Sequence, residues 1–193
     1  MWFHFEGRNL DAAELMMRYI RESMPVASIS VEIEALRNDW GSAMKLIFLA
    51  DYVFISKDYL REKLGFQSAE PFFEAIMSDR WGKMLAEKAK AFICPWGPEG
   101  VYYLDMREQI KHHAPAPRID SVVETIGAGD TFIGASLAGL SGGKVPLDQV
   151  VRTACEIAST KCTKRGLAVS NEDKVTWQMQ FNCKDESVGA NAA

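Results

Sequence analysis

The sequence has no uninterrupted apolar run of the roughly 18 residues that a membrane-spanning helix requires. It also has no basic excess, because 26 acidic and 22 basic side chains give a net charge of −4. Nucleic-acid-binding proteins normally carry a basic excess or patch, so this class is not expected. The first residues, Met1–Arg8, lack the basic start and long apolar stretch of a signal peptide. We therefore expect no nucleic-acid partner, no membrane partner and a cytoplasmic location.

Cysteine and histidine are scarce, with four and three residues among 193. The cysteines form no Cys-x-x-Cys pair, and their spacing fits neither a disulfide framework nor a zinc site. His112 and His113 are adjacent, so on a strand they would point to opposite faces, and no acidic or cysteine partner is spaced around them. We expect a solvated loop pair there. Free thiols in a reducing compartment are expected at Cys94, Cys155, Cys162 and Cys183.

Short apolar runs alternate with amphipathic stretches, and the length suits one domain. This alternation predicts parallel strands joined by helical crossovers, in a sheet covered on both faces. Asp11 and Glu14 have the spacing of a capping box, and Gly41 is an expected helix break. Strands are expected at residues 2–5, 26–33, 51–56, 91–94, 101–104 and 121–123, helices at 11–24, 35–50, 57–64, 69–90, about 130–140 and 147–165, and a surface loop at 107–120.

The segment Gly127-Ala128-Gly129-Asp130 lies between a predicted strand and a predicted helix. Glycines let a ligand approach the backbone, and the first amides of a helix lack internal partners and carry partial positive charge. Such a turn suits a phosphate or a developing anion, and Asp130 could then act as a general base on a hydroxyl. The same residues also suit a plain helix cap, since aspartate is a favoured N-cap. The lysine of a Walker loop and the third glycine of a dinucleotide-binding loop are absent.

Acidic and basic residues also follow predicted strands. Glu32 and Glu34 point to the same side of a strand near its carboxyl end. They could bind Mg²⁺ through water beside the phosphates of a nucleotide, or simply form a solvated pair. Lys57 could reach a phosphate or remain a surface lysine. Ligands of parallel sheets bind beyond the carboxyl ends of the strands, which is where these residues are expected.

Other candidate residues have two interpretations each. Arg8 and Asn9 follow the first strand and could face a cleft, although Asn9 also suits a helix cap. Trp96 could stack near a nucleotide or cover a hairpin. Cys155 and Cys162 lie seven residues apart on one helical face, so they could line a pocket wall or fill the core.

Residues Val122–Phe132 read Val-Val-Glu-Thr-Ile-Gly-Ala-Gly-Asp-Thr-Phe, which closely resembles the carboxy-terminal signature of the PfkB, or ribokinase-like, sugar kinases. Further segments are similar to the ketohexokinase (fructokinase) branch of this family, and the resemblance covers about residues 2–166 in order. It implies a three-layer α/β/α ribokinase-like (Rossmann-like) sandwich with a mostly parallel sheet. The similar segments are Trp2–Asn9, Ser30–Glu34, Val53–Asp58, Leu64–Glu70, Cys94–Gly100 and Ala154–Cys162.

The resemblance implies an ATP-dependent kinase that transfers the γ-phosphate to a hydroxyl of fructose and yields fructose 1-phosphate. Asp130 would contact the sugar as the general base, and the amides of Gly127, Ala128 and Gly129 would form the anion hole. Mg²⁺ would accompany ATP, with Glu32 and Glu34 as its water-mediated ligands, and a monovalent cation such as K⁺ is also allowed. The residues implied in nucleotide binding are Trp96, Gly97, Pro98, Glu99, Gly100, Phe132, Cys155, Ala158 and Cys162.

The similar region does not include the amino-terminal portion of the family's kinase domain. In relatives this portion provides the first sheet strands and a β lid, which covers the sugar and forms the dimer. We therefore expect residues 1–166 to be a partial kinase domain with an impaired sugar site and no family homodimer. A divergent, flexible tail is expected at 167–193. Glu124 stands where the family signature normally has aspartate.

Two alternative functions stay open. The chain could be a non-catalytic nucleotide-binding remnant or regulatory partner, or a kinase of another sugar or nucleoside, such as ribose or adenosine. A dinucleotide-dependent oxidoreductase is a third class. It would place its glycine turn after the first strand, whereas Gly127 lies late in this chain.

Overall fold

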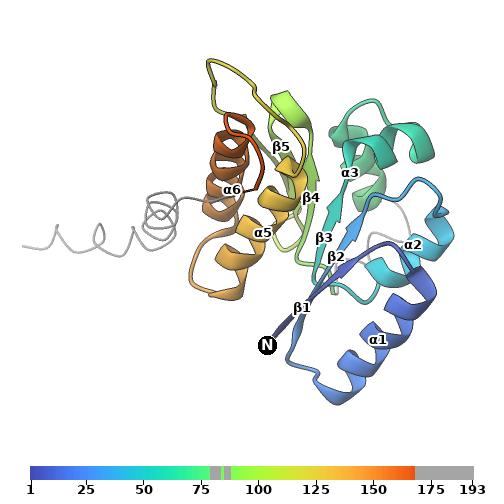
Figure 1. The fold of residues 1–193 in the computed structure, drawn as a ribbon. Coiled ribbons are helices and arrows are strands. Elements are labelled where there is room, and N and C mark those ends of the chain that lie inside the picture. The colour runs from blue at the N-terminus through green and yellow to red at the C-terminus, as the bar shows by residue number, and fades with distance from the viewer. Residues whose placement is uncertain (79–83, 85–87, 168–193) are drawn as a thin grey trace, which may run out of the picture. The chain divides into compact units, whose positions relative to one another are not determined.

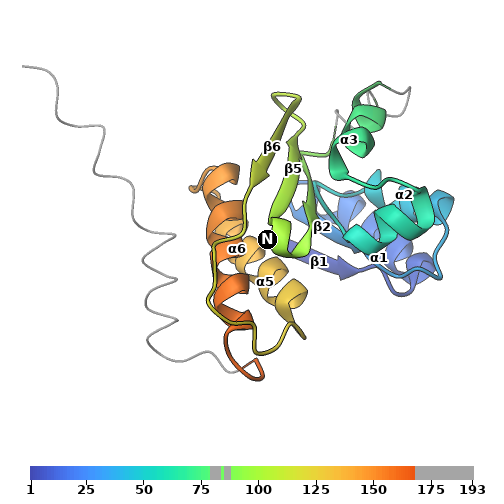
Figure 2. The ribbon, with the colours of Figure 1, turned by 90° about the horizontal axis from the view of Figure 1, so that it is seen from above.

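The computed structural model of the chain describes residues 1–78, 84 and 88–167. The chain divides into two compact units, Met1–Ala114 and Pro115–Ala193. Figures 1 and 2 show their elements from two directions. Cys183, the predicted tail beyond Leu167 and most of the predicted helix after Ser78 lie outside the described residues. Of the helices in the described part, none is long and apolar enough to cross a membrane.

The first unit contains a six-stranded sheet whose spatial order, β1-β2-β3-β4-β5-β6, equals its chain order. Strands β1 to β4 run parallel, and β5 and β6 continue the sheet antiparallel. The predicted α/β fold with a mostly parallel sheet is therefore confirmed. The strands are β1 (Trp2–Glu6), β2 (Ser28–Ile33), β3 (Tyr52–Ile55), β4 (Ala91–Pro95), β5 (Val101–Asp105) and β6 (Ile110–Ala114).

Strand β6 corrects the surface loop that was predicted after β5. It pairs with β5 along its whole length, and His112 and His113 stand opposite Tyr103 and Tyr102. The rings of His113 and Tyr102 stack with their centroids 4.3 Å apart, and those of His112 and Tyr103 with centroids 4.9 Å apart. Cross-strand aromatic pairs stabilise a sheet, and an edge strand tolerates a polar composition. The histidine pair therefore belongs to a strand and not to a loop.

Helices connect the parallel strands on one face of the sheet (Figure 1). Crossovers between parallel neighbours are almost always right-handed, which places successive helices on the same side. Helix α2 begins after its Asp39 cap and contains Gly41, so the predicted break at this glycine is wrong. The connecting helices are α1 (Leu10–Ser23), α2 (Trp40–Ile47), a π-helical turn (Tyr59–Lys63) and α3 (Ala69–Ser78).

Helix α1 begins one residue earlier than predicted, because Asn9 caps it. The Asn9 side chain accepts a hydrogen bond from the Ala12 amide at 3.3 Å. The capping box predicted from Asp11 and Glu14 is therefore wrong. Glu14 instead accepts a hydrogen bond from Arg18 Nε at 2.8 Å, one turn further along the helix.

The two faces of the sheet differ in chemistry. Val31 and Ile33 of β2 and Val53 and Ile55 of β3 belong to the main apolar core and are 0–2% exposed. The opposite face carries polar and aromatic groups, where Trp2 Nε1 and His4 Nδ1 each lie 2.9 Å from Ser30 Oγ. Burial lowers the pKa of His4. The alternation of β2 therefore places its aliphatic side chains in the core that contains residues of the connecting helices.

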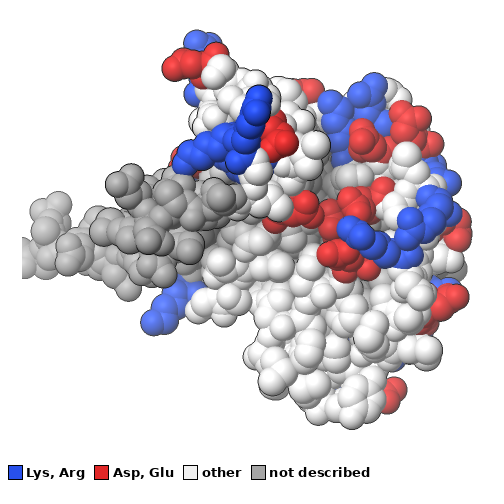
Figure 3. Space-filling model, viewed as in Figure 1, with Lys and Arg blue, Asp and Glu red and all other residues white. Residues whose placement is uncertain are grey.

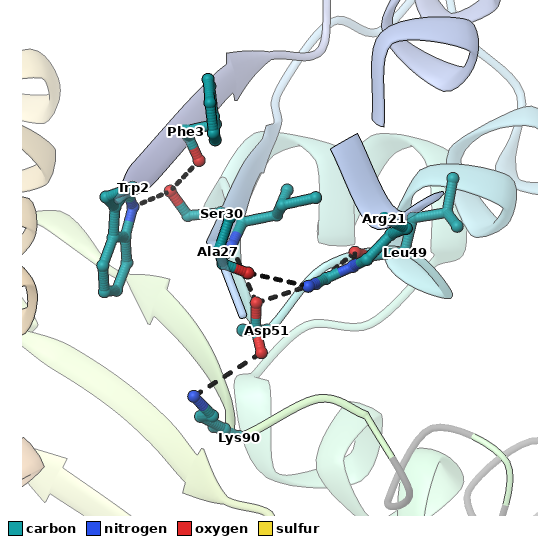
Figure 4. A network of polar contacts seen from close by, with 9 residues as sticks. Trp2, Phe3, Arg21, Ala27, Ser30, Leu49, Asp51 and Lys90 are labelled. Atoms are coloured by element: carbon teal, nitrogen blue, oxygen red, sulfur yellow. Dashed lines mark hydrogen bonds and ion pairs between the residues drawn. The ribbon is translucent and has the colours of Figure 1, made fainter. Parts of the chain in front are cut away.

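A polar network closes the amino-terminal ends of the strands (Figure 4). Arg21 of α1 donates to Leu49 O at 2.9 and 2.6 Å, to Ala27 O at 3.0 Å and to Asp51 Oδ2 at 2.8 Å. Asp51 Oδ2 also accepts the Ile29 amide at 2.7 Å. One guanidinium therefore ties α1 to the segments that lead into β2 and β3.

The second unit contains α5 (Ala128–Ser141) and α6 (Leu147–Cys162), which pack against each other. The strand predicted at 121–123 is not formed. Val122 and Val123 are exposed, and the amides of Val123 and Glu124 donate to the Cys162 carbonyl at 2.8 and 3.2 Å. The end of α6, and not a neighbouring strand, accepts hydrogen bonds from these amides. The apolar pair alone therefore gave a wrong prediction of a strand.

Gly7→Ala is expected to destabilise the first unit, because β1 ends against the backbone of β2. A Cβ built at Gly7 would lie 2.4 Å from the carbonyl oxygen of Glu32. The main chain would have to shift, at a cost of about 1–3 kcal/mol of unfolding free energy. Denaturant titration followed by circular dichroism measures this loss. Gly134→Ala is the control, since a methyl group there meets no atom within 4 Å; equal stability of the two variants would contradict the prediction.

Candidate functional site

The carboxyl ends of the parallel strands bring four predicted residues to one edge of the sheet. Arg8, Glu34, Lys57 and Gly97 follow β1, β2, β3 and β4, which pair in that order. Ligands of parallel α/β sheets bind beyond this edge. Strand pairing therefore assembles, within the first unit, one part of the predicted site.

The turn between β4 and β5 holds the predicted nucleotide-binding residues. It forms a single 3₁₀ turn at Gly97–Glu99, with φ of +64° at Gly97 and +102° at Gly100, values that favour glycine. The Trp96 amide donates to Gly100 O at 2.7 Å, and His113 Nε2 lies 2.8 Å from Glu99 O. The turn is thus anchored to its own hairpin and to β6.

Trp96 supports this turn from the interior. It is 2% exposed, belongs to the main core and packs edge-on against Tyr102, with ring centroids 6.0 Å apart. A ring buried to this extent does not stack on a nucleotide in this conformation; it covers the hairpin. Lys57 Nζ lies 5.7 Å from the Trp96 ring centroid, a cation–π distance. This contact keeps one positive charge beside the turn.

The other predicted residues at this edge differ in their surroundings. Glu32 is half-buried on β2, whereas Glu34 lies beyond the strand end and is exposed. Arg8 forms an exposed ion pair with Glu6 at 2.8 Å, and Asn9 serves as the cap of α1. Among the described residues, no group of three or more His, Cys, Asp or Glu side chains could hold a metal ion. A role of the two carboxylates beside a phosphate-bound Mg²⁺ stays a prediction.

Surface charge is mixed in sign. In the upper and right-hand parts of the face drawn in Figure 3, acidic and basic side chains lie interspersed, while much of its lower part carries neither. The whole chain carries a net charge of −4. An anionic ligand would therefore be recognised by local groups and not by a broad positive field.

In the second unit the glycine turn begins α5. Gly127 is the N-cap, with a left-handed φ of +77° that favours glycine. The Ala128 amide donates to Thr125 O at 3.0 Å. By contrast, the amides of Gly127, Gly129 and Asp130 donate to no acceptor within the described residues. These three amides, at the positive end of the helix, are the donors that this conformation offers to an anion.

Asp130 lies in the first turn of α5, and its side chain is exposed. Because Gly127 is the cap, Asp130 does not play the capping role that was its alternative interpretation. The Thr131 hydroxyl donates to Gly127 O at 2.8 Å and closes the turn from within. A carboxylate placed beside free amides can accept a proton from a hydroxyl that is held there.

Sequence reasoning missed Lys161, which is 7% exposed in the last turn of α6. Its Nζ donates to Glu124 O at 3.2 Å and to Ile126 O, and lies 3.5 Å from Glu124 Oε2. Glu124 Oε2 also accepts the Gly166 amide at 2.6 Å. That amide, together with the Lys161 ammonium, holds the pKa of the Glu124 carboxyl below its usual range. The helical spacing could have predicted that Lys161 is buried, since it lies three residues after Ala158 on the apolar stripe of α6.

The remaining residues predicted near the nucleotide base lie on α5 and α6. Phe132 is 2% exposed and Cys155 6%, whereas Ala158 and Cys162 are partly exposed. Burial raises the pKa of the Cys155 thiol. Cys155 and Cys162 are both free, as is Cys94. Cys155, Ala158 and Cys162 are small neutral residues of α6, which suits contact with an adenine. This role stays a prediction.

Comparison with known proteins relates the chain to carbohydrate kinases. Residues 30–174 match the family described as pfkB family carbohydrate kinase. Ketohexokinase from Mus musculus is 33% identical over 173 residues, which are 86% of this chain and 53% of the mouse protein. The chain thus spans about half the length of this relative.

Solved structures share the fold. Aminoimidazole riboside kinase from Salmonella enterica, solved with aminoimidazole riboside and an ATP analog, has a TM-score of 0.70 at 21% identity, covering 93% of this chain and 62% of its own. Ribokinase from Thermotoga maritima has a TM-score of 0.64 at 19% identity, covering 92% and 56%. The sheet and its helices therefore form the ribokinase-like α/β fold. The family match extends over more than half of the residues, so the chain belongs to the pfkB family of carbohydrate kinases.

Proposed function

We propose that the chain carries the nucleotide-binding and catalytic-base side of an ATP-dependent sugar kinase of ketohexokinase type, within residues 1–166. The observation that carries this proposal is the start of α5, where three amides without an acceptor among the described residues adjoin the exposed carboxylate of Asp130. Donors and a base at one helix end suit phosphoryl transfer, which depends mostly on positioning and charge stabilisation. Fructose is the proposed acceptor, because mouse ketohexokinase is a relative at 33% identity.

In the proposed reaction Asp130 accepts the proton of the sugar hydroxyl as its oxygen attacks the γ-phosphorus. The bond between the γ-phosphorus and the bridging oxygen breaks, and ADP leaves with that oxygen. The amides of Gly127 and Gly129, joined by that of Asp130, stabilise the charge on the transferring group. Ala128, which was expected in the anion hole, would first have to release its bond to Thr125.

The proposed nucleotide site uses the preformed turn at Gly97–Gly100, with Pro98 and Glu99 exposed and Trp96 as its support. Phe132, Cys155, Ala158 and Cys162 are proposed to lie near the adenine. Glu32 and Glu34 are oxygen donors of the kind that Mg²⁺ binds through water, and the ion would neutralise phosphate charge. The buried free thiols support a reducing cytoplasm as the location.

A matched pair of glycine substitutions tests the amide site. Cβ atoms built at Gly129 and Gly134, both helical positions of α5, meet no atom within 4 Å. Alanine is therefore expected to raise stability at either position, by up to about 1 kcal/mol. Only the Gly129 methyl group would occupy the place of a phosphate beside the free amides, so Gly129→Ala is expected to weaken ATP binding about tenfold or more.

Calorimetric titration with Mg²⁺–ATP and thermal unfolding with and without ATP measure both effects. Equal ATP affinity of Gly129→Ala and Gly134→Ala would reject the amide site while leaving the kinase assignment open. Absence of ATP binding to the unmodified chain would overturn the proposed function. ATP-dependent stabilisation without ADP release on adding fructose, ribose or adenosine would favour the non-catalytic alternative.

A further inference from the structure

Oxygen atoms that precede the glycine turn converge on one buried cation. The Lys161 side chain is 6% exposed, and its ammonium contacts the carbonyl oxygens of Glu124 and Ile126 and the carboxylate of Glu124. A buried ammonium is costly unless oxygens satisfy its three donors, and here each donor has an acceptor. The side chain therefore joins the end of α6 to the segment that leads into α5.

The same segment is held from its backbone. The amides of Val123 and Glu124 donate to the Cys162 carbonyl, one residue beyond Lys161. The Glu124 carboxylate accepts the Gly166 amide at 2.6 Å, so it bridges both sides of the contact. The same oxygen, Glu124 Oε2, lies 3.5 Å from Lys161 Nζ, so one carboxylate makes both contacts.

Peptide geometry connects this contact with the free amides. The Ile126 carbonyl and the Gly127 N–H belong to one planar trans peptide group and point in opposite directions. An Ile126 carbonyl bound to Lys161 therefore sets the direction of the Gly127 N–H. We propose that Lys161 is a positioning residue that orients the amides at the start of α5 by holding the Glu124–Ile126 segment; its consequence for ATP rests on the proposed function.

Lys161→Met tests this inference, because it removes the ammonium and keeps an unbranched apolar stem. Lys144→Met makes the same change at an exposed lysine of the same unit. Hydrogen exchange of the bonded amides of Val123 and Ala128 is expected to speed up about tenfold in Lys161→Met, and ATP affinity to fall about tenfold. Lys144→Met is expected to change neither. Lower stability of Lys161→Met with unchanged exchange and unchanged ATP affinity would show a merely structural role and overturn the inference.

Chemical rescue supplies a readout that does not need ATP. Lys161→Ala leaves space beside the three oxygens, so ammonium or methylammonium ions are expected to slow the exchange of Val123 and Ala128 toward the original rate. Tetramethylammonium, which has no N–H donor, is expected not to do so. Equal effects of the three ions would contradict the inference.

Separate outcomes distinguish this inference from the proposed function. If the unmodified chain does not bind ATP, but the Lys161 variants show the expected differences in hydrogen exchange and their rescue, the proposed function is rejected and the positioning role is kept. If Lys161→Met binds ATP as tightly as the unmodified chain does, the positioning role is rejected and the proposed function is kept. If Lys161→Met does not fold, Lys161→Arg retains the charge and is expected to keep ATP affinity within a few-fold of the original; a loss about as large as that expected for Lys161→Met would contradict a role that depends on a cation.

Discussion

Asp130→Asn is expected to lower the rate of phosphoryl transfer by about 10²- to 10⁴-fold, the usual contribution of a general base, and to leave ATP binding nearly unchanged. Asparagine has the same shape and cannot accept the hydroxyl proton. The Asp130 side chain is exposed and is not the cap of α5, so the substitution should cost the fold little. A coupled assay of ADP release with fructose, run beside calorimetric titration with ATP, separates the two effects.

Asp120→Asn is the matched control, because Asp120 is an exposed aspartate of the same unit outside the glycine turn. It is expected to retain the rate of the unmodified chain. A rate for Asp130→Asn equal to that of this control would show that Asp130 is not the base. If the unmodified chain binds ATP and releases no ADP, Asp130 has no rate to lose, and the non-catalytic alternative gains support.

Arg21→Met is expected to destabilise the first unit by about 2–4 kcal/mol, because it leaves two part-buried carbonyl groups without their donor and removes the closest cation from the Asp51 carboxylate. The Arg21 and Asp51 side chains are 22% and 14% exposed. The guanidinium binds two carbonyl groups and this carboxylate at once (Figure 4). Without it, the Asp51 carboxylate keeps only the Ile29 amide and the more distant Lys90, whose Nζ lies 3.6 Å from Asp51 Oδ1, among the contacts described above.

Arg18→Met on the same helix is the control. Arg18 is 55% exposed and pairs with Glu14 one turn away, an arrangement worth less than about 1 kcal/mol. Denaturant unfolding followed by tryptophan fluorescence compares the two variants. Arg21 acts at the amino-terminal ends of the strands, the edge opposite the Gly97–Gly100 turn, so ATP affinity of the folded protein should not change. Equal losses of stability from Arg18→Met and Arg21→Met would contradict the assigned importance of the network.

Local patterns predicted most of the first unit. The apolar alternation of β1 to β4 and the glycine-proline turn after β4 are properties of a few consecutive residues, so they could be recognised without tertiary contacts. Strand β6 was missed because its polar residues are stabilised by β5, where His112 and His113 stack on two tyrosines. The strand expected at 121–123 does not form, because the amides of Val123 and Glu124 bond to the end of α6 and not to a neighbouring strand. Here too, a tertiary contact decided the local structure.

The sequence by itself determined the fold class, the family and the position of the glycine turn, because a signature of consecutive residues identifies these. Only the tertiary structure decided that the Ala128 amide is bonded, that the amides of Gly127, Gly129 and Asp130 have no acceptor in the described part of the chain, and that Trp96 faces the core. It also decided that Lys161 lies buried against Glu124 and Ile126, which are 37 and 35 residues away in the chain. Such contacts depend on how α6 packs against the segment before α5, and no periodicity within either segment encodes that packing.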